Sequence, residues 1–316
     1  MVTLEWEHIW ARYERRWRLR DVCLRAQAGE AVGLVGPAGS GKSTMLRVAA
    51  GLVRTESGHL WVNGGIPRRH ASGVLPPDDR PHPHLTVARN IERRAARSGL
   101  HGRDLERRLR LTLRAWDLEP FRDVRARTLP SSILHRLCLA GQWACPGSAW
   151  LLDNPAALLD PDWRDALPRL LAEWRQREGG ATVMAANTPD EASGVDAVAV
   201  MVAGRIAAMG EPARICRAAG TEQIVVRTVD DEAAAVALRS NLRLEAEKRP
   251  EGLLLRVRRA DEALGGIVSA VGAGLETVWV RRPTLRDAVT HYAALPPPPD
   301  LPTQPPIERQ DGLKRR

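Results

Sequence analysis

The stretch that decides the fold is Ala31–Thr44, which reads AVGLVGPAGSGKST. Its opening AVGLV predicts a short buried strand, and KSTMLRVAAGL, from Lys42 onward, carries apolar residues at helical spacing. Between these segments the pattern G-x-x-x-x-G-K-S/T is satisfied by Gly36, Gly41, Lys42 and Ser43. The sequence therefore predicts a strand, a glycine-rich loop and a helix, in the order that a phosphate-binding loop requires.

The residues of this loop have separate roles in phosphate binding. Glycines let consecutive backbone N–H groups turn inward onto phosphate oxygens, and the helix that follows adds the positive end of its dipole. The Lys42 ammonium can reach the β- and γ-phosphates, and the Ser43 hydroxyl can ligate Mg²⁺. We therefore expect a nucleoside triphosphate to contact the loop Gly36, Pro37, Ala38, Gly39, Ser40, Gly41, Lys42, Ser43 and Thr44.

A second stretch, AWLLDNPAALLD at Ala149–Asp160, complements the first. The apolar residues before Asp153 predict a buried strand. A strand that ends in Asp is the usual Mg²⁺-binding partner of such a phosphate loop. The two stretches together predict that Ser43 and Asp153 hold Mg²⁺.

Composition limits the remaining classes of function. The chain has 47 Lys+Arg against 38 Asp+Glu, a net charge of +9, but aromatic residues make up only 4%. Because the arginines are spread along the chain, we expect no nucleic-acid partner. The longest apolar runs fall short of the roughly 20 residues of a membrane-spanning helix, and MVTLEWEHIW does not fit a signal peptide. Free thiols of a reducing compartment are expected at Cys23, Cys138, Cys145 and Cys216.

Up to about residue 216 the chain alternates strand-like and helix-like segments, as in an α/β domain. SAWLLD and ATVMAAN predict two further buried strands, and DAVAVMVAGRIAAMG predicts two strands around a turn at Gly204. An arginine-rich helical insert is expected from about Leu85 to Arg127, with its arginines on a solvated face. His82 and His84 are expected to be loop residues rather than metal ligands.

After Cys216 the pattern changes. Short strands are predicted at QIVVRT, LRLEAE, LLLRVR and ETVWVRR, with helices at DEAAAVALRS and ADEALGGIVSAV between them. This order predicts a small α+β domain. The stretch LPPPPDLPTQPP near the end is too rich in proline to pack a core and is expected to be disordered.

Several segments together resemble the ATP-binding subunit of an ABC transporter, over roughly residues 1–215. Tyr13, in RYERRW, occupies the place where this family stacks an aromatic ring on adenine; Trp10 and Trp17 are alternatives. GLVRTESGHLWVNG resembles the family's stretch after the phosphate loop, and PHLTVARNI resembles the start of its helical subdomain. The place of the family's LSGGQ signature, 24 residues before Asp153, is taken by Leu129, Pro130, Ser131, Ser132 and Ile133.

The resemblance implies an α/β fold of the P-loop NTPase type, with a helical subdomain, followed by a small α+β C-terminal domain. The expected domains are 1–216 for ATP binding, with the helical subdomain at about 80–140, then 217–293 for the accessory domain and 294–316 for the proline-rich tail. The segment ETVWVRRPTLRDAVTHY resembles the close of an accessory domain found in type-2 exporter ATPases of the drug-resistance group. It therefore favours an exporter.

Four positions that act on the γ-phosphate or the attacking water in this family carry other residues here. The catalytic Glu is Asn154, the switch His is Asn187, the Gln position is Pro77, and the signature reads LPSSI. Asn154 cannot take a proton from water at neutral pH, and general acid–base help is worth roughly 10² to 10⁴ in rate. We therefore predict ATP binding with impaired hydrolysis. Hydrolysis could be rescued by Asp78 or Asp79, through contact with the metal, or by Ser131 or Ser132, through donation to the γ-phosphate.

The resemblance also implies partners. Members of the family close head to tail as pairs of ATP-binding subunits beside a membrane permease, so this chain is expected in the cytoplasm, at the inner face of the membrane. We expect ATP and Mg²⁺ as ligands, and a second ATP-binding subunit in a hetero- or homodimer. A heterodimer with a competent ATPase is favoured, because a homodimer would have both of its sites impaired. The alternatives are an exporter ATPase whose substitutions are compensated, and a nucleotide-sensing scaffold without a transporter.

Overall fold

The computed structural model describes residues 2–13, 16–65, 74–75, 80–147, 149–192, 194–257 and 259–296. Within them the chain divides into two compact units, with the boundary after Glu211. The predicted proline-rich tail lies almost entirely outside the described residues. No helix of the part that is described has the length and apolar character needed to cross a bilayer.

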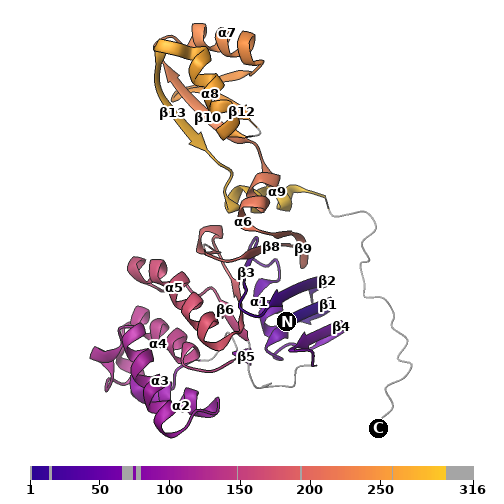
Figure 1. Ribbon diagram of the computed structural model, residues 1–316. Coiled ribbons are helices and arrows are strands. Elements are labelled where there is room, and N and C mark those ends of the chain that lie inside the picture. Colours follow the sequence, from indigo (N-terminus) through magenta and orange to yellow (C-terminus); the bar gives the residue numbers. More distant parts are fainter. Residues whose placement is uncertain are drawn as a thin grey trace. The chain divides into compact units, whose positions relative to one another are not determined.

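The larger unit is built around a six-stranded sheet, drawn in Figure 1. Its strands, in spatial order, are β5 (Val74–Leu75), β6 (Ala149–Asp153), β7 (Ala181–Ala185), β3 (Ala31–Val35), β8 (Ala197–Val202) and β9 (Arg205–Gly210). All neighbours run parallel except β8 and β9, which form the predicted hairpin around Gly204. Strands β3 and β7 are buried throughout, because α-helices and a second sheet cover this sheet.

A three-stranded antiparallel sheet packs beside the central one. Its order is β2 (Arg16–Gln27), β1 (Val2–Tyr13) and β4 (Thr55–Val62). One apolar core joins both sheets to α1 (Lys42–Ala49), and it includes Trp6, Leu34, Met45 and Leu151. The strand, loop and helix predicted around the phosphate loop are thus confirmed and lie in the centre of this unit.

The helical part of the larger unit consists of α2 (Val87–Arg97), α3 (Gly102–Ala115), α4 (Ser131–Trp143) and α5 (Pro161–Glu178). Figure 1 shows α2, α3 and α4 gathered on one side. Trp150 of β6 connects them to the sheet, since its Nε1 donates to Gln142 of α4 at 2.7 Å and its ring lies 5.4 Å from that of Trp174 on α5. The strand that ends in Asp153 is therefore tied to two helices by buried indoles.

The smaller unit, Pro212–Ala294, has a separate four-stranded antiparallel sheet. The strands, in spatial order, are β11 (Ala246–Arg249), β12 (Gly252–Val257), β10 (Glu222–Thr228) and β13 (Leu275–Arg281). Its helices are α6 (Pro212–Ala219), α7 (Asp231–Leu242), α8 (Ala260–Val271) and α9 (Leu285–Ala294). This unit supplies the α+β part of the predicted fold class.

The strand predicted at LRLEAE is wrong over most of its length. Helix α7 continues to Leu242, and Arg243 ends it in the left-handed conformation with φ +54°. Strand β11 begins only at Ala246. The alternation of apolar and polar residues predicts a strand, but a helix end and a connection occupy the first four residues of LRLEAE.

We predict that the larger unit folds and binds nucleotide without the smaller one. The two apolar cores share no residue, since one ends at Met201 and the other begins at Ile224. A fragment of residues 1–216 should unfold cooperatively and bind a fluorescent ATP analogue as the full chain does. A fragment that ends at Glu211 should do the same and avoids cutting α6. Insoluble or nucleotide-free fragments would contradict this domain division.

Candidate functional site

The predicted phosphate loop joins β3 to α1 at the carboxyl end of the central sheet. Gly36 and Gly41 have φ angles of +152° and +110°. A Cβ at Gly36 would lie 2.1 Å from the carbonyl oxygen of Met201, and a Cβ at Gly41 would lie 2.7 Å from that of Arg18. Both positions therefore require glycine, because neighbouring backbone fills the space of any side chain.

The Lys42 side chain folds back over this loop. Its Nζ donates to the carbonyl oxygens of Gly36 at 2.8 Å and Pro37 at 3.1 Å. Burial lowers the pKa of Lys42 below its usual value, and the Asp153 carboxylate opposes that shift. The ammonium is thus held against the loop, with one of its three N–H groups not used in these two bonds.

Ser40 provides the best test of whether a phosphate group fits the loop. The residue is 4% exposed, and its Oγ has no hydrogen-bond partner among the described residues. Leaving a buried hydroxyl unpaired costs about 1–3 kcal/mol, so a ligand oxygen or water is expected there. The loop therefore presents a donor, a folded-back ammonium and a helix N-terminus to the same region, which fits an anionic group.

The predicted Mg²⁺ ligands come together in the structure. The Ser43 hydroxyl, in the first turn of α1, donates to Asp153 Oδ1 at the end of β6 with an oxygen–oxygen distance of 3.0 Å. A hydroxyl and a carboxylate are hard oxygen ligands of the kind that Mg²⁺ prefers beside phosphate groups. This donor set fits the ion, and the two residues are 110 positions apart in the sequence.

The two Asn residues at substituted family positions follow neighbouring strands. Asn154 comes directly after β6, and its backbone N–H donates to Ala185 of β7 at 2.8 Å. It has φ +53°, and its buried Oδ1 has no hydrogen-bond partner within the described residues. Asn187 is exposed, and its backbone N–H is capped by the Glu191 carboxylate at 3.0 Å. An Asn suits the left-handed turn at 154, since its short side chain tolerates that conformation.

Tyr13 lies close to the helix that follows the phosphate loop. The Arg47 guanidinium of α1 lies 5.5 Å from the centroid of its ring. Of the alternative aromatic residues, Trp10 is fully buried, and Trp17 contacts it edge-on at 5.5 Å and is covered by Arg12. Of these three rings, Tyr13 is the one with a contact to α1, and it stays the predicted adenine-stacking residue.

We predict that Tyr13→Ala weakens ATP binding by about 1 kcal/mol, the magnitude of one aromatic contact. Titration of a fluorescent ATP analogue measures this change as a roughly fivefold rise in Kd. The matched control is Trp17→Ala, which should leave the affinity unchanged. The opposite pattern would transfer the stacking role to Trp17.

The signature positions lie at the start of α4. Pro130 precedes the helix, and Ser131 and Ser132 form its first turn, with Ser131 exposed. One turn further on, His135 Nε2 donates to the Pro155 carbonyl oxygen at 2.8 Å. The helix is therefore linked to the turn that follows Asp153 and Asn154. Sequence reasoning missed this link, because nothing in the spacing of His135 and Pro155 indicates it.

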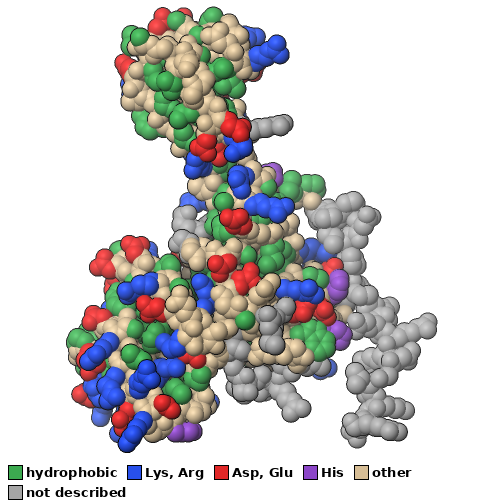
Figure 2. Space-filling view, in the orientation of Figure 1, with side chains coloured by type: hydrophobic (Ala, Val, Ile, Leu, Met, Phe, Trp, Pro, Cys, Tyr) green, Lys and Arg blue, Asp and Glu red, His purple; other side chains and the backbone are tan. Residues whose placement is uncertain are grey.

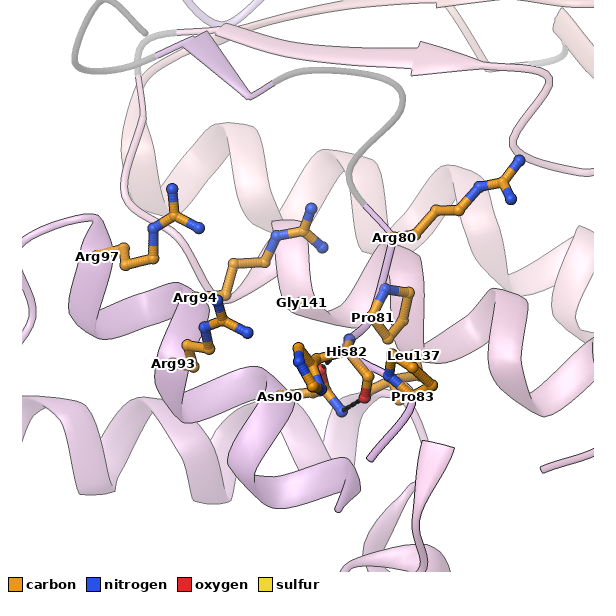
Figure 3. A pocket seen from close by; sticks show the side chains of 10 residues that line it. All are labelled: Arg80, Pro81, His82, Pro83, Asn90, Arg93, Arg94, Arg97, Leu137 and Gly141. Carbon is orange, nitrogen blue, oxygen red and sulfur yellow. Dashed lines mark hydrogen bonds between the residues drawn. The ribbon is translucent and has the colours of Figure 1, made fainter. Parts of the chain in front are cut away.

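Three sequence-predicted residues, Pro77, Asp78 and Asp79, lie outside the described residues. The loop that follows them, Arg80–Pro83, forms one wall of a pocket of about 330 Å³. Figure 3 shows the opposite wall, where Arg93, Arg94 and Arg97 project from α2, while Arg80 points away from them. Basic side chains are also abundant on the α2–α4 side in Figure 2. This face suits an anionic partner group.

Asn90 fixes that pocket wall. Its side-chain amide donates to the carbonyl oxygens of His82, Leu85 and Thr86 at 3.0–3.2 Å, and its Oδ1 accepts the His82 N–H at 2.6 Å. His82 and His84 both lie in the loop before α2, as predicted. The centroids of their rings are 5.9 Å apart. The loop is held against α2 by one side chain.

Comparison with known proteins agrees with this geometry. Residues 19–157 match the family described as ABC transporter. A Yersinia pestis protein named as the Fe(3+) ions import ATP-binding protein FbpC is 32% identical over 264 residues, covering 78% of this chain and 70% of that protein. The sn-glycerol-3-phosphate import ATP-binding protein UgpC 1 of Rhizobium johnstonii is 28% identical, but the match covers only 62% of this chain and 55% of its own length.

Solved structures support the fold. The structure titled as the ATP-binding subunit of an ABC transporter superposes with a TM-score of 0.63 at 23% identity, over 68% of this chain and 92% of that one. At this identity the likeness concerns the fold alone. It confirms the predicted P-loop α/β architecture with its helical subdomain.

Proposed function

This chain belongs to the ABC transporter family, and we propose that it is an ATP-binding subunit that binds Mg-ATP between Gly36 and Thr44 but hydrolyses it poorly by itself. One observation carries the proposal. The contact between Ser43 and Asp153 is intact, at 3.0 Å, while the residue directly after Asp153 is an Asn in a left-handed turn. The residues that would bind nucleotide and Mg²⁺ are therefore present in this sequence, whereas the catalytic Glu is replaced.

Binding is supported by the groups that remain. The Lys42 ammonium can exchange its two bonds to loop carbonyl oxygens for phosphate oxygens, and the Ser40 hydroxyl can donate to one. Mg²⁺ held by Ser43 and Asp153 would neutralise phosphate charge. Tyr13 would cover the base. Lys42, Ser43, Asp153 and Tyr13 lie on α1, β6 and β1, which contribute side chains to the buried core, so we expect their positions to be set before a nucleotide arrives.

Poor hydrolysis is supported by the groups that are absent. Neither amide at 154 or 187 can take a proton from water at neutral pH, and neither can carry the positive charge of an imidazolium. Asn187 is exposed, and only its backbone is fixed by Glu191. Hydrogen bonds to water or to a γ-phosphate oxygen are therefore the most that the two amides can contribute.

The direction of transport that the relatives support is import. The names of FbpC and UgpC 1 both say import. The match to FbpC covers 78% of this chain, which is more than the unit up to Glu211 contains, so it extends into the smaller unit. The export direction is the second candidate. It rests on the resemblance of ETVWVRRPTLRDAVTHY to the close of the exporter group's accessory domain, and on the length and predicted strand order of residues 217–293.

The partners in this proposal are a membrane permease and a second ATP-binding subunit with intact catalytic residues. The arginines of α2 favour a permease segment that carries acidic groups, because three guanidinium groups line one pocket. In this arrangement the protein lies at the inner face of the membrane through its partner. A nucleotide-sensing scaffold would need neither this pocket nor a permease.

Two assays on the purified chain test the proposal. The chain should bind a fluorescent ATP analogue with micromolar to millimolar affinity, and this affinity should fall when Mg²⁺ is removed. Phosphate release from ATP should stay at the background of a protein-free control. A chain that binds no nucleotide would overturn the whole proposal, and a chain that binds and turns over would overturn only its second half.

A further inference from the structure

The N-terminal sheet contains an irregularity that the nucleotide site does not explain. Between Trp6 and Ile9, β1 holds one residue more than the facing part of β2, whose partners are Leu24 and Val22. Between Ile9 and Ala11 it is β2 that holds one residue more, because the partners of these two residues are Val22 and Leu19. Between Trp6 and Ala11 each strand thus contains one bulge, and these two bulges cancel in the register.

Each bulge contains a left-handed residue that is not glycine. His8 of β1 has φ +49°, and Asp21 of β2 has φ +55°. Such conformations are uncommon for residues other than glycine, and bulges typically re-aim a side chain. Here both side chains turn away from the buried core, toward the face that carries Cys23.

The third strand of the sheet accommodates the same bulge. Gly58 of β4 has φ +82°, and a Cβ at this position would lie 2.2 Å from the His8 carbonyl oxygen. The backbone of β1 therefore approaches β4 so closely at His8 that only glycine fits opposite it. The backbone position of His8 is therefore determined by the bulges of β1 and β2 and by the close approach of Gly58 in β4.

The three side chains converge on one point. His8 Nδ1 lies 2.7 Å from Asp21 Oδ1 and 3.7 Å from Cys23 Sγ, and the three ligand atoms all lie within 4.8 Å of one another. The His8 backbone N–H also donates to Cys23 Sγ at 3.3 Å, so the backbone holds the sulfur beside the ring. Because the same ring nitrogen faces both the carboxylate and the sulfur, the arrangement is not a proton relay through the ring.

We propose that His8, Asp21 and Cys23 bind a divalent transition-metal ion of the Zn²⁺ type. An imidazole nitrogen, a carboxylate oxygen and a thiolate are the ligand types that Zn²⁺ takes, and three protein ligands leave a fourth, water-filled position. The thiolate and carboxylate together supply two negative charges, which match the ion. The set is too soft for Mg²⁺, so this site is distinct from the pair Ser43 and Asp153.

The site lies on β1 and β2, and Tyr13 is the last residue of β1. An ion that joins β1 to β2 would hold together the hairpin at whose end the proposed adenine-stacking ring is located. The metal site stands independently of the proposed function, because none of its three ligands belongs to the nucleotide site.

Cobalt titration of the full chain tests this inference. Chelator-treated, nucleotide-free protein is titrated with Co²⁺ alone, whose thiolate complexes give a charge-transfer absorption band. We expect one Co²⁺ per chain with this band, displaced by Zn²⁺, and a rise in Tm on addition of Zn²⁺. Cys23→Ser should abolish the band, and His8→Asn, which tolerates the left-handed conformation, should weaken binding at least tenfold.

Two matched controls separate this site from the rest of the chain. Cys216→Ser removes a different partly exposed cysteine, and His59→Asn removes a histidine of β4 in the same sheet. Both should bind Co²⁺ as the unaltered protein does. Absence of a thiolate band, or a band that survives Cys23→Ser in a folded protein, would overturn the proposal.

Discussion

Lys42→Ala should weaken Mg-ATP binding by roughly 10- to 150-fold, the largest effect on binding that we expect from any single substitution in this chain. A hydrogen bond to a charged group is worth about 1.5–3 kcal/mol, which corresponds to this range. The structure strengthens the argument, because Lys42 is nearly buried and its ammonium already lies on the loop. No other Lys lies near this loop in the sequence, since the remaining two are Lys248 and Lys314.

Isothermal titration with Mg-ATP measures the effect. Lys248→Ala is the matched control, since Lys248 is an exposed lysine of the smaller unit and should leave the affinity unchanged. Because Lys42 also bonds to Gly36 and Pro37, the unfolding of the variant is followed by circular dichroism to exclude a collapsed loop. A folded Lys42→Ala variant that binds ATP with unaltered affinity would place the nucleotide elsewhere.

The parts of the fold that the sequence predicted well are those where local pattern and burial agree. The run AVGLV is buried at all five positions of β3, and the glycines of the loop occupy φ values that other residues avoid. The run LRLEAE shows that alternation alone does not make a strand. Its residues alternate regularly between apolar and polar, but the helix before it continues to Leu242 and ends where Arg243 turns left-handed.

The site shows the same contrast. The pairing of Ser43 with Asp153 could be predicted, because phosphate loops and Asp-ended strands lie at one edge of a parallel sheet. The cluster of His8, Asp21 and Cys23 could not, because its members have no metal-ligand spacing and meet only through two cancelling bulges. A bulge changes the apolar–polar alternation of a single strand only slightly. Its position can therefore be predicted only when the pairing of the two strands is known.

Purified by itself, this chain should release phosphate from ATP far below 1 per second, a rate that is modest for an enzyme. The groups at 154 and 187 act on one γ-phosphate, so their losses should be non-additive. Asn154→Glu alone should therefore gain little. It also places a Glu at φ +53°, a left-handed conformation that Asn tolerates better than Glu because its short side chain can hydrogen-bond locally.

Asn154→Glu combined with Asn187→His is the variant that should restore a measurable rate, when a partner subunit supplies an intact signature across the interface. The double variant restores both a base beside Asp153 and an imidazole two residues after β7, whose last residue, Ala185, accepts the Asn154 backbone N–H. Asp153→Asn in the same background is the control and should abolish the gain, because it removes the proposed Mg²⁺ ligand. If instead the unaltered chain turns over ATP near 1 per second without a partner, catalysis is compensated from another source. Ser131 and Ser132, in the first turn of α4, are then the first described residues to replace, followed by Asp78 and Asp79.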